Sequence, residues 1–340
     1  MSAEDFPSLL KRVAAGQTLD AEQSSRAFGL IMAGEVSETR IAALVTAMAV
    51  RKPTIDEIVG AVRAMRGAMK SIEANPYAID LCGTGGDGIG TLNISTACAF
   101  VVAACGVPVA KHGNRNMSSK SGTADCLEAL GVNIELSPSG ASRCLREVGL
   151  CFLFAQAYHP AIKYAAPVRK ELGFRTIFNL IGPLSNPAHV RRQLVGVYDP
   201  DWTGPLAEVL GRLGTERAWV VHGDGLDEIA ISGPTRVAEL AEGKVTSREI
   251  VPEDAGLKRS PLAAIAGGTA VENAAALRRL FDSEAGAYRD IVLINSAAAL
   301  IVAGKAQDLK QGAALAAAAI DKGEARAKLD LLVAVSRAAT

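Results

Sequence analysis

The chain has 340 residues, which is enough for about two domains and for a large core without disulfide or metal staples. Its 36 basic and 36 acidic side chains balance, which argues against a general nucleic-acid binder, because such proteins usually carry a basic excess. A hydrophobic content of 49% with 33 glycines excludes intrinsic disorder as a description of the whole chain and is typical of an Ala/Gly-rich α/β or α protein.

The N-terminal block, up to about residue 70, predicts helices only. Apolar residues recur every three or four positions over Phe6–Ala15, Asp20–Ala33 and Ser37–Arg51, as they do in helices that bury one face. Thr54 followed by Glu57 matches a capping box and opens a fourth helix. No segment of this block has the pattern of a strand.

From Tyr77 onward, short apolar runs alternate with helical segments, as in βαβ units with a mostly parallel sheet. The expected strands are Tyr77–Cys82, Val107–Ala110, Val132–Leu136, Cys151–Phe154, Gln193–Tyr198 and Ala218–Val221. The expected helices between them are Ser95–Cys105, Ala124–Leu130, Pro138–Val148 and Trp202–Leu213. Residues 228–251 alternate around Glu242–Gly243 as an antiparallel hairpin does, and the chain is helical from about Ala274 to its end.

His159–Asn186 interrupts this alternation with helical and turn-like sequence. We therefore expect an α/β protein: a large domain with a mostly parallel central sheet flanked by helices, and a small all-helical domain. Residues 1–73 and about 160–190 would form the small domain, and residues 74–159 and 191–340 the large one.

The first of two glycine-rich loops, Gly83–Thr96, reads GTGGDGIGTLNIST and leads from a predicted strand into a helix. Glycines let the backbone approach a ligand closely, and the helix start offers unpaired N–H groups and a positive dipole end. This pattern favours a phosphate site. It is not a Walker A motif, since no Gly-Lys-Ser/Thr follows, and it is a poor dinucleotide fingerprint. A tight strand-to-helix turn is the structural alternative.

The second loop follows the next predicted strand and reads KHGNRNMSSKSGTAD from Lys111. It holds three cations, Lys111, Arg115 and Lys120, among Asn, Ser and Gly, a composition suited to several phosphate oxygens. A solvated polar loop is the alternative. Two such loops at the carboxyl ends of adjacent parallel strands predict a crevice for a ligand with two phosphate groupings.

The segments GTGGD from Gly83, NIST from Asn93 and KHGNR from Lys111 resemble the signature of the anthranilate phosphoribosyltransferase family, within the nucleoside phosphorylase/phosphoribosyltransferase superfamily. PVR, RTIFN, GPLSNP and GDGLDE follow in the family's order, so the resemblance covers essentially the whole chain. It implies a homodimer paired through the helical domains. It also implies transfer of phosphoribosyl from 5-phosphoribosyl 1-diphosphate (PRPP) to the amine of anthranilate, which releases pyrophosphate in the second step of tryptophan biosynthesis from chorismate.

By this resemblance, Lys111, His112 and Arg169 are catalytic residues, and Lys111 neutralises the developing phosphate charge. No strong general base is needed, because an arylamine nitrogen is already nucleophilic. The implied PRPP-binding residues are Gly83, Gly86, Asp87, Thr91, Asn93, Ile94, Ser95, Thr96, Lys111, His112, Gly113, Asn114, Arg115, Asn116, Met117, Ser118, Ser119 and Thr123. The implied anthranilate-binding residues are Gly83, Asn114 and Arg169, whose guanidinium fits a carboxylate bidentately.

The resemblance also implies two Mg²⁺ ions per subunit, with Ser95 on the first ion, Asp227 on the second and Glu228 on both. Without the resemblance, the adjacent acids Asp227 and Glu228 would be more typical of a solvated surface. Arg169 would then be more typical of a cation on an exposed helix face. Asp224 does not match the metal-binding positions of the family's segment, so we do not expect it to bind the metal. His159 either lines the channel for the aromatic acid or caps a helix.

Two alternatives stay open. A pyrimidine nucleoside phosphorylase of the same superfamily would carry a different second loop, so KHGNR and Arg169 disfavour it. A non-enzymatic, nucleic-acid-binding paralogue would need a basic surface, so the zero net charge and the pair Asp227 and Glu228 disfavour it. The expected partners are therefore the small molecules PRPP and anthranilate, with no nucleic acid.

The sequence shows no pattern of export or of membrane insertion. The first residues lack a basic segment followed by an apolar run, and the longest apolar stretch, Ala97–Ala110, is interrupted by Gly106 and Pro108. The six cysteines form no C-x-x-C pair, which favours reduced thiols over disulfides or a zinc site. We expect a cytoplasmic protein with no membrane partner.

Overall fold

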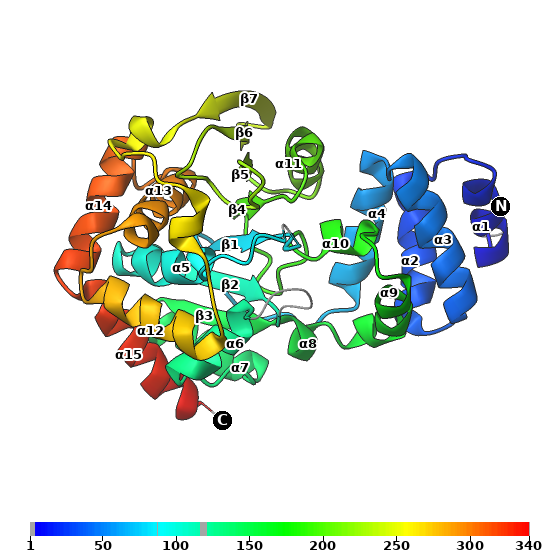
Figure 1. The fold of residues 1–340 in the computed structure, drawn as a ribbon. Coiled ribbons are helices and arrows are strands. Elements are labelled where there is room, and N and C mark those ends of the chain that lie inside the picture. Colours follow the sequence, from blue (N-terminus) through cyan, green and yellow to red (C-terminus); the bar gives the residue numbers. More distant parts are fainter. Residues whose placement is uncertain (1–3, 87, 116–120, 340) are drawn as a thin grey trace. The chain divides into compact units, whose positions relative to one another are not determined.

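The computed structural model describes residues 4–86, 88–115 and 121–339 and divides into two compact units (Figure 1). The helical unit comprises Met1–Ser71 and Gln156–Pro187, and the sheet unit comprises Ile72–Ala155 and Ala188–Thr340. Across the described ranges, no helix combines the length and the apolar character needed to cross a bilayer.

The helical unit is built from amphipathic helices whose starts are fixed by local capping. Its helices are α1 (Phe6–Ala14), α2 (Ala21–Ala33), α3 (Glu38–Arg51), α4 (Ile55–Gly67), α8 (Ala155–Tyr158), α9 (Ala166–Leu172) and α10 (Ile177–Ile181), with a 3₁₀ helix at Pro160–Tyr164. The predicted capping box is confirmed: Thr54 Oγ1 accepts from Glu57 N at 3.3 Å, and Glu57 Oε2 accepts from Thr54 N at 2.9 Å. Glu57 is fully buried, and it is also bound by Arg51, so this cap ties α3 to α4.

The sheet unit holds one seven-stranded sheet in the order β3-β2-β1-β4-β5-β6-β7. Its strands are β1 (Ile79–Gly83), β2 (Val109–Gly113), β3 (Leu150–Phe154), β4 (Arg192–Gly196), β5 (Arg217–Gly223), β6 (Thr235–Ala241) and β7 (Lys244–Ile250). The first five are parallel, and β6 and β7 add an antiparallel hairpin. The prediction of a mostly parallel sheet with an antiparallel excursion around Glu242–Gly243 is confirmed.

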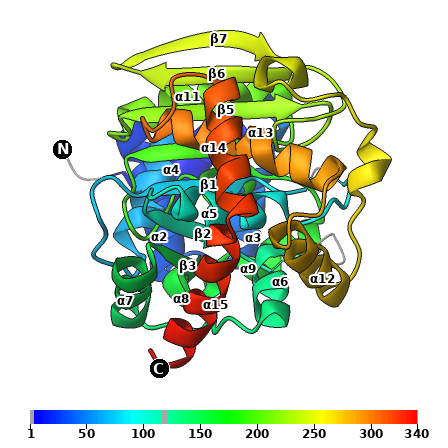
Figure 2. The ribbon, with the colours of Figure 1, turned by 90° about the vertical axis from the view of Figure 1, so that its left-hand side faces the viewer.

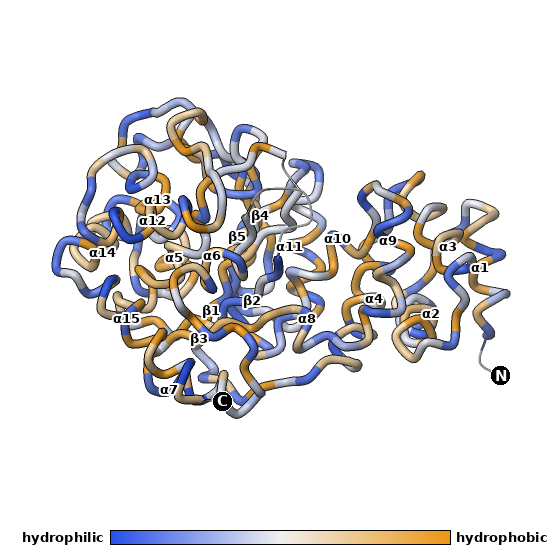
Figure 3. The backbone as a smooth tube through the Cα atoms, turned by 60° about the horizontal axis from the view of Figure 1, so that its bottom comes forward, coloured by the Kyte–Doolittle hydropathy of each residue, from blue (hydrophilic) through white to orange (hydrophobic). Residues whose placement is uncertain are grey.

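Helices cover both faces of this sheet. They are α5 (Ile94–Ala104), α6 (Thr123–Leu130), α7 (Pro138–Val148), α11 (Thr203–Arg212), α12 (Ala270–Phe281), α13 (Ala287–Val302), α14 (Leu309–Asp321) and α15 (Glu324–Arg337), with 3₁₀ helices at Pro200–Trp202, Pro252–Ala255 and Leu262–Ile265. Figure 1 shows α5 and α13 on the opposite face from α11, and Figure 2 shows α14 and α15 running across the face that α5 covers. The edge strand β3 is hydrophobic (Figure 3) and buried at every position.

The strand order creates a switch point between β1 and β4. From β1 the chain builds outward through β2 and β3, and it then returns to place β4 on the other side of β1, with Gly83 opposite Gly196. Ligands of open α/β sheets bind at such a point, beyond the carboxyl ends of the strands. Both glycine-rich loops leave strands at this edge, from the ends of β1 and β2.

The predicted strand Val132–Leu136 is wrong, because this segment has no regular secondary structure and joins no ladder. Asn133 donates its backbone N–H to Ser336 Oγ at 3.1 Å, and its own Oδ1 accepts the N–H of Glu135 at 3.1 Å. Side chains therefore use the donors that a neighbouring strand would have used. The alternating burial of Val132, Ile134 and Leu136 explains why the sequence pattern imitates a strand.

Candidate active site

The predicted site residues of the sheet unit gather at the carboxyl ends of β1 and β2 and at the start of α5. Gly83 ends β1; Gly86, Thr91 and Asn93 lie in the first loop; Ile94, Ser95 and Thr96 form the first turn of α5; Lys111, His112 and Gly113 end β2; Asn114 and Arg115 follow it; and Thr123 opens α6. Asp87, Asn116, Met117, Ser118 and Ser119 lie outside the described residues.

The first loop is a chain of glycines that face open space. Gly85, Gly88 and Gly90 have φ values of 66°, 78° and 69°, and a Cβ at any of them would meet no atom within 4 Å. Its base is fixed to the switch point, since Thr84 N donates to Gly196 O at 2.9 Å. The loop ends at Asn93, the N-cap of α5, whose side chain forms no capping bond with its own helix. Backbone N–H groups and the helix start can therefore face a ligand.

Lys111 is the buried cation of the site. It lies on β2 with only 3% of its surface exposed, and its Nζ donates to Leu81 O at 2.6 Å and to Ser95 Oγ at 3.1 Å. Within residues 4–86, 88–115 and 121–339, no carboxylate forms an ion pair with it. A buried cation that forms no direct ion pair is unfavourable, so this ammonium favours an anionic ligand beside Ser95.

The second loop begins with side chains that are already engaged. The Arg115 guanidinium pairs with Asp125 at 2.7 Å and with Glu128, and it lies 5.6 Å from the ring centroid of Phe154. His112 is buried, and its backbone N–H donates to Asp80 Oδ1 at 3.0 Å. Arg115 is thus held by acids in this structure, although the family resemblance implies contact with PRPP.

The acidic pair of the β5–β6 connection lies against the first loop. Asp227 Oδ2 accepts from Gly85 N at 2.7 Å. A Cβ at Gly83 would stand 2.1 Å from that oxygen, and a Cβ at Gly196 would stand 1.5 Å from Asp227 O. Only glycine fits at these two positions while Asp227 keeps its place.

Glu228 shares its surroundings with Lys111. Burial first, and then the nearby Glu228 carboxylate, raise the pKa of the Cys98 thiol, whereas Lys111 lowers it. The Cys98 side chain therefore lies within electrostatic reach of both charged groups. Asp224, by contrast, is exposed and accepts a bond from Ser232 Oγ at 2.5 Å.

The oxygen donors Ser95, Asp227 and Glu228 fit Mg²⁺, which prefers hard oxygen ligands and retains several waters. Among the described residues, no group of three or more His, Cys, Asp or Glu side chains could hold a metal ion.

In the helical unit, Arg169 lies on α9 with its guanidinium carbon 5.6 Å from the ring centroid of Phe178. Arg169 is half-buried, and burial lowers the pKa of its guanidinium. His159 is 3% exposed; burial lowers its pKa to about 4, and a hydrogen bond with the Ser185 backbone opposes that shift. His159 occupies the N-cap position of the 3₁₀ helix Pro160–Tyr164, in line with the capping alternative, although its side chain forms no capping hydrogen bond.

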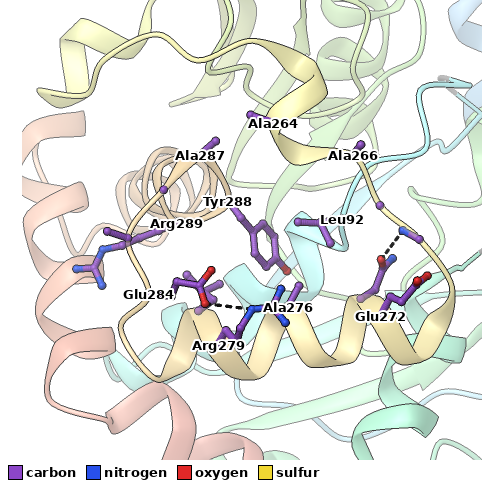
Figure 4. Close-up of a pocket in the computed structure, with 16 residues that line it drawn as sticks. Leu92, Ala264, Ala266, Glu272, Ala276, Arg279, Glu284, Ala287, Tyr288 and Arg289 are labelled. Carbon is purple, nitrogen blue, oxygen red and sulfur yellow. Dashed lines mark hydrogen bonds and ion pairs between the residues drawn. The ribbon is translucent and has the colours of Figure 1, made fainter.

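A cavity of about 520 Å³ lies between α12 and α13, behind the end of the first loop at Leu92 (Figure 4). Its charged side chains include Arg279, paired with Glu284 at 3.0 Å, and Arg289, paired with Asp321 at 2.8 Å. Because these cations are already paired with acids, a polyphosphate fits this cavity less well than it fits the loop itself.

Sequence reasoning missed Asn273 and Tyr288, which contact Asn93 from α12 and α13. The available signal was a polar residue on an apolar helix face, because Asn273 shares its side of α12 with Leu277 and Leu280. A buried asparagine requires hydrogen-bond partners.

Comparisons with known proteins agree with this geometry. The chain matches the family models described as glycosyl transferase family, a/b domain, over residues 75–326, and glycosyl transferase family, helical bundle domain, over residues 7–69. It is 54% identical to the anthranilate phosphoribosyltransferase of Rhodopseudomonas palustris strain HaA2, over 98% of this chain and 99% of that one. It is also 54% identical to the enzyme of the same name from Xanthobacter autotrophicus, over 98% and 97% of the two chains.

Solved structures give the same result. The anthranilate phosphoribosyltransferase of Thermus thermophilus superposes with a TM-score of 0.93 at 45% identity, over 97% of this chain and 99% of that one. The Saccharomyces cerevisiae enzyme in complex with PRPP and Mg gives a TM-score of 0.89 at 26% identity, over 98% of both chains. The chain therefore belongs to the anthranilate phosphoribosyltransferase family, with the α/β and helical-bundle domains of that glycosyl transferase group.

Proposed function

We propose that the chain transfers the phosphoribosyl group of PRPP to the amine of anthranilate and so forms N-(5-phosphoribosyl)anthranilate and pyrophosphate. Relatives that are 54% identical along nearly their whole length carry the name of this activity. The structural observation that carries the proposal is Lys111, a buried cation without an acidic ion-pair partner in the described residues, beside the glycine loop and the start of α5. The reaction is the second step of tryptophan biosynthesis from chorismate.

PRPP would bind across the first loop and the ends of β1 and β2. The open glycines supply close backbone approach, Asn93 and the first turn of α5 supply donors, and Lys111 supplies positive charge where the leaving diphosphate accumulates negative charge. The residues of the second loop, including the five that lie outside the described ranges, would complete the phosphate contacts.

Magnesium would be held by Ser95, Asp227 and Glu228, and we propose two ions per subunit. The yeast relative was solved with PRPP and Mg, which supports the metal. When bound, Mg²⁺ neutralises diphosphate charge and stabilises the leaving group. The chain's own part is to hold Asp227 in place through Gly85 and to keep the Ser95 hydroxyl beside Lys111.

By the family resemblance, Arg169 would pair with the anthranilate carboxylate, Asn114 would bond its amine or carboxylate, and Gly83 would be a further anthranilate-binding residue. The half-buried Arg169 guanidinium lies 5.6 Å from the ring centroid of Phe178, and its planar fork can pair bidentately with a carboxylate. A yeast relative was solved with 4-fluoroanthranilate, an analogue of this acid. Since the arylamine is itself nucleophilic, correct placement replaces a general base.

We also propose a homodimer paired through the helical unit and a cytoplasmic location, as the family resemblance implies. The six cysteines are free thiols, which supports a reducing compartment.

The decisive experiment mixes the protein with anthranilate, PRPP and Mg²⁺ and follows anthranilate fluorescence while each component is omitted in turn. Fluorescence should fall only in the complete mixture. Thymidine phosphorolysis without anthranilate turnover would instead indicate a pyrimidine nucleoside phosphorylase. Salt-sensitive DNA binding without PRPP binding would indicate the non-enzymatic alternative.

A further inference from the structure

Asn273 joins α12 to the first loop through two hydrogen bonds. It is 1% exposed; its Oδ1 accepts the backbone N–H of Gly268 at 2.8 Å, and its Nδ2 donates to Asn93 Oδ1 at 2.9 Å. Figure 4 shows the wall of α12 facing Leu92, the residue before Asn93. Asn273 therefore connects α12 to the end of the loop at Asn93.

These bonds fix which way the Asn93 amide faces. A backbone N–H can only donate, so the atom of Asn273 that meets Gly268 must be its oxygen. The other end of Asn273 must then be the NH₂ group, and Asn93 must meet it with its oxygen. The NH₂ is thus the end of the Asn93 amide that Asn273 does not bond, and it forms no hydrogen bond with another described residue.

The backbone around Asn93 is clamped from the same side. Tyr288 donates its hydroxyl to Asn93 O at 3.1 Å, and burial raises the pKa of Tyr288, which keeps that proton in place. Gly267 N donates to Gly90 O at 2.8 Å, and a Cβ at Gly267 would stand 2.4 Å from Thr91 O. The segment before α12 thus lies tightly along the end of the loop.

We propose that Asn273 is a positioning residue for PRPP: it holds the Asn93 side chain so that its NH₂ donates to a phosphate oxygen. This inference rests on the proposed function, because PRPP is the ligand. A donor amide suits an anion, whereas the flipped amide would present its oxygen and repel it. Asn273 itself touches no ligand and acts only through Asn93.

Asn273→Asp tests this orientation with a side chain of almost the same shape. The aspartate still accepts from Gly268, but it can no longer donate, so Asn93 must turn over to give it a proton. The Kd for PRPP with Mg²⁺, measured by calorimetry, should rise roughly ten- to hundredfold, the range for losing a hydrogen bond to a charged group. In turnover assays the KM for PRPP should rise likewise, while the KM for anthranilate and kcat stay within about threefold.

Asn133→Asp is the matched control. Asn133 also accepts a backbone N–H, from Glu135 at 3.1 Å, and donates its NH₂ to a protein oxygen, Ser336 O at 3.4 Å. Its bonding partner is Ser336 on α15, outside both loops, so the same chemical change there should leave PRPP affinity unaltered. Thermal unfolding of both variants reports whether each remains folded. If Asn273→Asp does not fold, Asn273→Ala replaces it without a buried charge, with an expected rise in Kd of roughly threefold or more.

A double-mutant cycle separates positioning from general support. In an Asn93→Ala background, Asn273→Asp should weaken PRPP binding no further, because its effect passes through Asn93. Additive losses, or unchanged binding in the single variant, would overturn the positioning role and leave the proposed function intact. A wild-type protein that fails to bind PRPP would overturn both.

Discussion

Asp227 Oδ2 lies 2.7 Å from the backbone nitrogen of Gly85, although 142 residues separate the two in sequence. The bond joins the connection after β5 to the glycine loop after β1, across the switch point of the sheet. A carboxylate that we propose as a metal ligand is therefore already oriented by the loop that we propose to bind the diphosphate. Metal and substrate affinity should be linked through this contact.

Replacing the acidic pair should abolish magnesium-dependent turnover. In Asp227→Asn combined with Glu228→Gln, hard anionic ligands become neutral amides of similar size, so kcat/KM for PRPP should fall by roughly a hundredfold or more. The measurement is initial rate against Mg²⁺ concentration. Asp224→Asn, which changes an exposed carboxylate nearby, is the control and should behave as wild type. Full activity in the double variant would remove the metal role.

Arg169→Ala should affect one substrate more than the other. Loss of the bidentate partner should raise the KM for anthranilate by roughly ten- to hundredfold, with much less change for PRPP. Steady-state kinetics with each substrate varied in turn gives the split. Lys170→Ala, on the exposed side of α9, is the control. Equal changes in both KM values would count against the assignment.

Lys111→Met should lower activity without lowering stability. The methionine fills the space of the lysine stem but carries no charge, so kcat/KM for PRPP should drop by roughly a hundredfold. Removing a buried ammonium that lacks an acidic partner in the described residues should leave the free energy of unfolding unchanged or raise it. Paired kinetics and urea denaturation test both halves, with Lys305→Met as a surface control. A variant that is both active and destabilised would contradict the prediction.

The protein should lose stability between pH 6.5 and pH 4 through His159. Burial lowers the pKa of this imidazole to about 4 from an ordinary 6.5, so only the unfolded chain takes up a proton in that window. Above pH 6.5 the ring is neutral in both states and the effect vanishes. At pH 5 the loss should be about 2 kcal/mol, since each pKa unit is worth about 1.4 kcal/mol.

Urea denaturation at pH 7.5 and pH 5 measures this loss, with His159→Gln as the comparison. The glutamine variant does not titrate, so the difference in unfolding free energy between the two pH values should shrink by about 2 kcal/mol. Other groups titrate equally in both proteins and cancel in the comparison. An identical pH dependence of the unfolding free energy in the two proteins would contradict the prediction. It would show that His159 takes up a proton as readily in the folded protein as in the unfolded chain.

Short sequence motifs correctly predicted those helix starts and turns that are formed by residues close together in the sequence. The capping box of Thr54 and Glu57 marks the start of α4, and Glu242–Gly243 turns the hairpin because both residues have positive φ values, 52° and 73°. The segment Val132–Leu136 is not a strand, because the Asn133 N–H donates to Ser336, a partner 203 residues away that no local sequence pattern indicates.

The site was predictable to the same degree. Glycine spacing and charge mark the loops, and Lys111 is recognisable as a cation at a strand end. The contact that supports the first loop could not be predicted from the sequence. Asn273 and Asn93 are 180 residues apart, and only the packing of α12 brings them together. Similarly, the ion pairs of Arg115 with Asp125 and Glu128 could not be predicted from the sequence, and its contact with PRPP stays a prediction.

Gly196 has no side chain to offer a substrate, yet any Cβ there would stand 1.5 Å from Asp227 O. Random mutagenesis scored by growth without added tryptophan would therefore find this codon as intolerant as that of the acidic pair. Substitutions in the loops of such an enzyme can be tolerated, whereas the glycine at position 196 of β4 cannot be replaced while Asp227 keeps its place.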